Sequence, residues 1–172
     1  MTVVWLSLLL VLPWLLTLGL ARWSSTARRL RPVAPRLGLA CVFLVTGISH
    51  FTRTDELAAM LPPDFPERAR IVHATGVLEL AGAIGLLVPR CSRVAAAALI
   101  VFLIAVFPAN IWAAFHRTGP GIHVAGPIYL LVRGPFQLLL IAWAWLGCLR
   151  APRSPTAADP PPRDSAAGLQ RD

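Results

Sequence analysis

Five long runs of apolar residues divide the sequence, and short polar segments separate them. The runs cover approximately residues 3–21, 37–51, 71–89, 94–115 and 128–149. Their apolar residues follow one another instead of alternating with polar ones, which indicates segments surrounded by lipid. A helix needs about 20 residues to cross the hydrocarbon layer, and four of the runs meet that length. The run 37–51 is shorter, so its predicted helix either falls short of the membrane surface at one end or extends past residue 51.

Composition supports a membrane protein. Hydrophobic residues make up 56% of the 172 residues and charged residues 14%, against roughly a quarter charged in a soluble domain. All sixteen basic residues are Arg, and the net charge is +8. These Arg residues flank the apolar runs and form no stripe on a soluble face, which argues against a nucleic-acid partner. We therefore expect an all-α polytopic protein whose partner is the lipid bilayer.

The order of charges predicts the orientation of the chain in the membrane. A cleaved signal peptide carries its positive charge before the apolar region. Here the region before the first run is uncharged, and five Arg follow it between residues 22 and 36. The positive-inside rule then favours a retained helix over residues 1–22 with the N-terminus outside. Five spans place the C-terminus in the cytoplasm, so we expect a multi-pass protein of the cell membrane.

Two segments outside the runs carry local signals. After the second run, Thr54 is predicted to cap a short helix, with Asp55 and Glu56 in its first turn and Pro62 and Pro63 ending it. Its apolar face would consist of Leu57, Met60 and Leu61. Such a helix lies on the outer membrane surface; an ordinary ordered loop is the alternative. Residues 150–172 have little to bury and predict a disordered cytoplasmic tail.

Polar residues within the apolar runs are the candidates for function. Glu79 shares a helical face with Thr75, Gly76 and Gly82, and small residues on one face mark close helix packing. Glu79 is therefore predicted to point into the bundle. Arg133 in the last run lies at a similar depth, which predicts a buried Glu79–Arg133 pair. Such a pair either fixes helix register or serves ligand binding or proton handling.

Four further polar residues complete the candidate set. Asn110 and Gln137 are predicted to extend the network around Glu79, and His50 and His73 lie at the outer ends of their helices. The spacing of the two histidines matches no zinc motif, so no metal site is predicted. We expect no resident cofactor, with a bound quinone as the one candidate.

The three cysteines argue against one class of enzyme. Cys41, Cys91 and Cys148 form no C-x-x-C motif, and the predicted topology places all three at the cytoplasmic end. Thiols there stay reduced. A quinone-linked disulfide-forming enzyme needs a close cysteine pair on the oxidising side, so the sequence does not predict that activity.

Several segments in fixed order resemble one family. They are GISHF at 47–51, LPP at 61–63, TGVLELAGAIGLLVP at 75–89, VFPANIW at 106–112 and RGPFQ at 133–137. Together they resemble the DoxX family of small bacterial membrane proteins over about residues 36–149. The resemblance implies a four-helix membrane domain over 36–149, with the first helix added to it. Some members are linked to thiosulfate oxidation with quinone and others to membrane complexes handling oxidative stress.

Three functions follow as hypotheses. The first is a membrane subunit of a redox or oxidative-stress system that binds quinone among the last four helices, with a soluble oxidoreductase partner carrying the redox cofactor. The second is a non-enzymatic scaffold or assembly factor whose polar residues hold helices together. The third, a small proton-coupled carrier, is less favoured because the sequence shows no internal repeat. The chain has no catalytic motif of its own, so whether it is an enzyme stays open.

Overall fold

A computed structural model describes residues 2–21, 23–30 and 33–150. The helices are α1 (Thr2–Leu20), α2 (Ser25–Leu30), α3 (Ala34–Thr52), α4 (Thr54–Ala58), α5 (Arg68–Leu87), α6 (Ser92–His116) and α7 (Leu130–Ala144). Turns of 3-10 helix, η1 (Gly121–Tyr129), precede α7, and a π-helical turn, η2 (Trp145–Leu149), follows it. These residues contain no strand, which confirms the all-α prediction. The tail predicted to be disordered lies, from residue 151 on, outside the described residues.

Five helices are long and apolar enough to cross a membrane, as the five runs predicted. The short second run becomes a full span of 19 residues, Ala34–Thr52. It gains its length at the N-terminal side, where Pro35 lies in the first turn. Proline is tolerated there because the first backbone N–H groups of a helix have no partner within the helix. The predicted extension past residue 51 amounts to a single residue.

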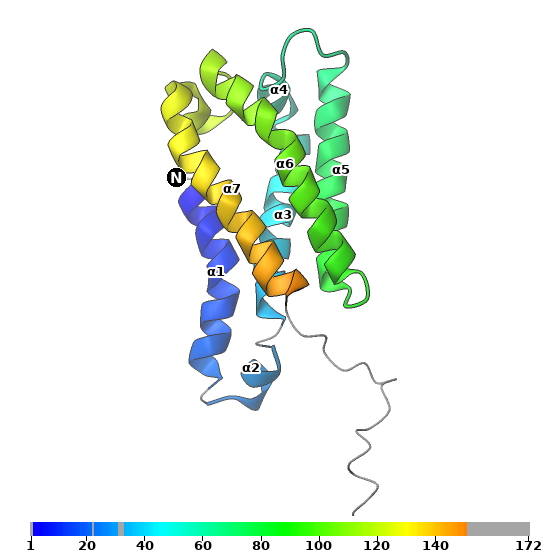
Figure 1. Cartoon of the computed structure of the whole chain (residues 1–172), viewed down its shortest axis with the longest axis vertical. Coiled ribbons are helices and arrows are strands. Elements are labelled where there is room, and N and C mark those ends of the chain that lie inside the picture. Colours follow the sequence, from blue (N-terminus) through cyan, green and yellow to red (C-terminus); the bar gives the residue numbers. More distant parts are fainter. Residues whose placement is uncertain (1, 22, 31–32, 151–172) are drawn as a thin grey trace, which may run out of the picture.

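The spans lie side by side as a bundle (Figure 1). The most extensive helix contact joins α3 and α5, and α1 packs against α3 at the side of the bundle. The α1–α3 contact depends on Gly38, because a Cβ atom there would overlap the backbone carbonyl of Leu10. Small residues at such crossings let two backbones approach closely in membranes. The first helix is therefore a packed member of the bundle.

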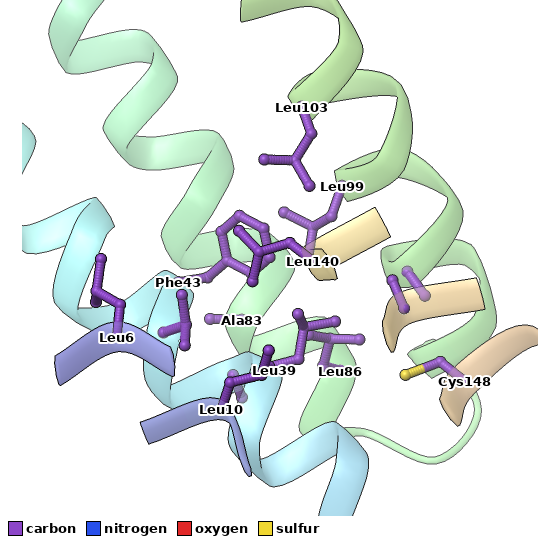
Figure 2. Close-up of a cluster of buried hydrophobic side chains, with 14 of the residues drawn as sticks. Leu6, Leu10, Leu39, Phe43, Ala83, Leu86, Leu99, Leu103, Leu140 and Cys148 are labelled. Atoms are coloured by element: carbon purple, nitrogen blue, oxygen red, sulfur yellow. The ribbon is translucent and has the colours of Figure 1, made fainter. Parts of the chain in front are cut away.

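The apolar core lies between α1, α3, α5, α6 and α7 (Figure 2). Leu10 of α1, Leu39 and Phe43 of α3, and Leu86 of α5 are almost completely buried. Leu140 and Cys148 close the core from the α7 side. Four polar residues of the runs, His50, Glu79, Asn110 and Arg133, lie beyond this core, toward the end of the bundle that carries α4.

The outward faces of the helices are apolar. Leu131, Val94 and Val101 are 74%, 73% and 66% exposed, and they belong to helices with no polar outer stripe. Exposed apolar surface on this scale marks a face that contacts lipid and not water. Together with the five spans, it defines a multi-pass membrane protein.

One end of the bundle carries a cluster of arginines. The end of α7 meets the starts of α3 and α6 there: Arg93 donates a hydrogen bond to the Leu149 carbonyl (2.6 Å), and the Trp143 indole N–H donates to the Pro35 carbonyl (3.1 Å). The start of α3, the α5–α6 turn, the start of α6 and the end of η2 lie at this end, opposite α4 (Figure 1), and they carry Arg36, Arg90, Arg93 and Arg150. The arginine-rich segments that the positive-inside rule counts thus share one side of the bundle.

Candidate functional site

A half-open cavity of about 130 Å³ lies between α3, α5, α6 and α7 at the end opposite the arginine cluster. Its polar lining consists of His50, Thr75, Glu79, Asn110 and Arg133. Apolar residues of α4 and the turn after it, α5 and α6 line the rest, among them Met60, Val72 and Phe102. Four of the six predicted site residues, from four different helices, therefore meet in one place.

Two glycines bring His50 and Glu79 together. A Cβ atom at Gly76 of α5 would lie 2.6 Å from the Cβ of His50, and one at Gly47 of α3 would lie 2.9 Å from the Leu80 side chain. Neither position leaves room for a larger residue, so α3 and α5 approach closely at this level. This approach places the imidazole of His50 beside the carboxylate of Glu79, one turn further along α5 from Gly76.

The hydrogen bonds of His50 determine which ring nitrogen carries a proton. Nδ1 lies 2.9 Å from the Val72 carbonyl oxygen, which can only accept. The Thr75 hydroxyl donates to the same carbonyl (2.8 Å), so its oxygen, 3.0 Å from Nδ1, accepts from His50 as well. Nδ1 is therefore the donor, and Nε2 faces Glu79.

Glu79 is the buried carboxyl group of the cavity. Its side chain is 9% exposed, and its Oε1 lies 3.6 Å from Nε2 of His50. Because a bare Nε2 and a carboxylate would present lone pairs to each other, a single proton on either group makes the contact favourable. The other oxygen, Oε2, is buried and has no hydrogen-bond partner among the described residues. The pair can thus hold one proton, while Oε2 remains available to a ligand.

Arg133 does not pair directly with Glu79, so that prediction is wrong. Its Nε–H donates instead to Oδ1 of Asn110 at 3.2 Å, and Asn110 donates through Nδ2 to the Val106 carbonyl of its own helix. The ion-pair partner of Glu79 is His50. The two charged groups line the same cavity without an ion pair between them. This arrangement offers a ligand an acceptor at Glu79 and guanidinium N–H donors at Arg133.

Gln137 and His73 lie apart from the cavity. Gln137 is buried, but its amide donates to the Leu103 carbonyl (2.8 Å) and ties α7 to α6, so the prediction that it completes the network around Glu79 is wrong. His73 is exposed and stacks on Phe51, with ring centroids 5.4 Å apart. Its Nε2 lies 3.0 Å from the Thr54 hydroxyl. Both residues hold helices or loops together.

The segment after α3 covers one side of the cavity. The short helix predicted there exists as α4, but Thr54 does not cap it: its hydroxyl donates back to the His50 carbonyl at 2.8 Å, and the N-cap position is Arg53. The helix ends at Ala58, before the two prolines. Leu57, Met60 and Leu61 line the cavity, and Met60 is buried. The apolar face identified in the sequence therefore packs on the bundle.

The fold and the site define a small multi-pass α-helical membrane protein with a polar cavity inside its bundle. Residues 39–148 match a family model described as a domain of unknown function (DUF8561), and the chain belongs to that family. The match begins within α3, so α1 lies outside the matched part. Searches of the curated proteins and of the solved structures give no match.

Proposed function

We propose that the cavity binds the single-ring head group of a quinone, and that the chain is a membrane subunit of a redox or oxidative-stress system. The observation that carries the proposal is the partnerless oxygen of Glu79, buried in a cavity that also presents Arg133. A volume of about 130 Å³ suits one six-membered ring, since an engineered cavity of roughly 150 Å³ binds benzene. The resemblance to the DoxX family supports the same ligand.

The residues of the site suit the two ends of such a ring. Oε2 of Glu79 would accept a hydrogen bond from a ring hydroxyl, and Arg133 would donate to the oxygen at the other side. The His50–Glu79 contact would take up or release the proton that accompanies electron transfer. A bound quinone would supply the electron-carrying chemistry, and a soluble oxidoreductase partner would carry the resident redox cofactor.

The scaffold hypothesis is weaker for a specific reason. A purely structural carboxyl group gains most when both of its oxygens are satisfied, because a buried unpaired acceptor costs about 1–3 kcal/mol. Among the described residues, only Oε1 of Glu79 has a partner, and Oε2 has none. A site prepared for a ligand accounts for that cost.

Binding of a short-chain benzoquinol, kept reduced, to the detergent-purified protein tests this function. Glu79→Gln is expected to weaken binding about tenfold or more, because hydrogen bonds to charged groups contribute about 1.5–3 kcal/mol. The measurement is calorimetric titration. Glu56→Gln, a matched change at an exposed carboxylate of α4, should leave binding unchanged. Equal affinities for both variants and the parent protein would contradict the proposal.

We further propose that the arginine-rich end faces the cytoplasm, with the N-terminus outside the cell membrane. Cys91 is exposed in the α5–α6 turn at that end. A membrane-impermeant maleimide should therefore label Cys91 only after spheroplasts are permeabilised. A Cys91→Ser variant carrying Asp64→Cys, in the loop at the other end, should be labelled in intact spheroplasts. Labelling of Cys91 from outside would reverse the proposed orientation.

A further inference from the structure

A second hollow lies on the outer surface between α5 and α6, and it shares one lining residue, Phe102, with the cavity of His50 and Glu79. It has a volume of about 650 Å³. Its floor and walls are apolar: Leu78, Ala81, Gly82, Val94, Ala95, Ala98, Leu99, Val101, Phe102 and Ala105. Arg90 and Cys91, in the turn between the helices, line one end of this groove, which we call the α5–α6 groove.

Small side chains keep the α5–α6 groove hollow. Ala81 and Ala98 are exposed at its surface, and Gly82 lies against Leu99, where an added Cβ would come within 2.6 Å. Val101 and Phe102 are larger residues of the groove lining. Because the two helices touch through Gly82, the groove is bounded at its back by packed protein. A flexible apolar chain therefore finds contacts there that a flat helix surface would not offer.

The length of the groove matches one leaflet of a bilayer. At about 1.5 Å of rise per residue, the stretch from Val94 to Ala105 spans about 17 Å. Half of a hydrocarbon layer of roughly 30 Å is about 15 Å. A transmembrane helix of a partner would need a contact face running through both leaflets. The α5–α6 groove ends halfway, at the level of Leu78 and Ala105, as the acyl chain of a single lipid does.

The charge at the end of the groove indicates the head group. Arg90 is exposed and lies beyond the end of α5, at the level where a helix leaves the hydrocarbon. No carboxylate of the described residues lies within ion-pair distance of it. A guanidinium in this position can bond a phosphate oxygen through two N–H groups. A net-negative head group would gain more from this cation than a zwitterionic one.

We propose that the α5–α6 groove is a binding site for one anionic phospholipid, with an acyl chain along Ala95, Ala98 and Ala105 and the phosphate at Arg90. The proposal does not depend on the proposed quinone function, although Phe102 lines both the groove and the quinone cavity. The groove lies on the outward-facing side of α5 and α6, whereas His50, Glu79 and Arg133 face the interior of the bundle.

Native mass spectrometry of the full-length protein tests the lipid site. The probe is an equimolar mixture of phosphatidylglycerol and phosphatidylcholine with identical acyl chains. We expect one phosphatidylglycerol to be retained preferentially, and Arg90→Gln to reduce that preference about fivefold, the effect of one cation at a membrane surface. Arg150→Gln removes the same charge at the same end outside the groove and should not change the preference.

A second pair of variants tests the acyl-chain part. Ala98→Leu fills the groove from an exposed position and should reduce retention of both lipids, whereas Ala97→Leu, exposed on the same helix but outside the lining, should not. Equal preference in the parent and Arg90→Gln proteins would overturn the head-group assignment. Equal retention by Ala98→Leu would overturn the groove. If the parent protein were a dimer and the Ala98→Leu variant a monomer, the groove would hold a second copy of the chain instead of a lipid.

Discussion

His50→Leu is expected to destabilise the folded bundle by about 3 kcal/mol. The substitution leaves the Glu79 carboxyl group buried at 9% exposure with neither of its oxygens partnered by the described residues. Removing one member of a buried ion pair costs about 3–5 kcal/mol because the other member stays desolvated. The measurement is unfolding of the purified protein in mixed detergent and SDS micelles, followed by circular dichroism. His73→Leu, which removes the Thr54 hydrogen bond and the Phe51 stacking of an exposed histidine, should cost less, about 1 kcal/mol.

The double variant His50→Leu with Glu79→Leu separates a structural pair from a functional one. Replacing both members of a buried pair by apolar residues is often neutral or stabilising. We therefore expect the double variant to recover most of the stability while still failing to bind the benzoquinol. Losses that simply add would show that the two side chains do not interact. Recovery of stability together with normal ligand binding would make the pair structural.

Gly38→Ala is expected to loosen α1 from the bundle, at a cost of up to about 3 kcal/mol. A Cβ at this position would overlap the Leu10 carbonyl oxygen, and a backbone atom cannot rotate away as a side chain does. Overpacking of a well-packed contact typically costs 1–3 kcal/mol, about the size expected here. The same unfolding assay measures the loss, and limited proteolysis of the segment between α1 and α3 detects the release of α1.

Gly19→Ala supplies the matched control for Gly38→Ala. Gly19 lies near the end of α1, and an added Cβ there meets nothing within 4 Å. Alanine is also the better helix former, by about 1 kcal/mol. This variant should therefore be as stable as the parent protein or more so. Because helix propensity favours alanine at both positions, similar losses at Gly19 and Gly38 would contradict the assignment of the effect to the α1–α3 contact.

The predicted pair of Glu79 and Arg133 shows where reasoning from the sequence reached its limit. Depth in the membrane follows from counting residues, and both side chains do line one cavity. Which residues touch depends on how far apart the helices lie and how each is rotated. Gly47 and Gly76 bring α3 so close to α5 that His50, and not Arg133, contacts Glu79. The two glycines were visible in the sequence, but the pairing of their helices was not.

Gln137 and Met60 show the same limit: the first was predicted at the cavity and lies outside it, and the second lines the cavity although the sequence did not predict it. Gln137 lies one helical turn from Arg133, yet its amide is directed to the Leu103 carbonyl of α6 and away from the cavity. Met60 comes from a segment that the sequence placed either on the membrane surface or in an ordinary loop. In the structure it is buried against the cavity. Side-chain direction on α7 and the docking of α4 are both results of packing with distant segments.

The sequence by itself determined the five spans, the all-α class and the burial of Glu79. These properties are local: a run of apolar residues must leave water, and a carboxyl group within it must turn away from lipid. Only the tertiary structure decided that His50 partners Glu79, that Arg133 contacts Asn110, and that α4 closes the cavity. Those choices depend on distances between helices, which are set where Gly38, Gly47 and Gly76 allow close contact and not by any single stretch of chain.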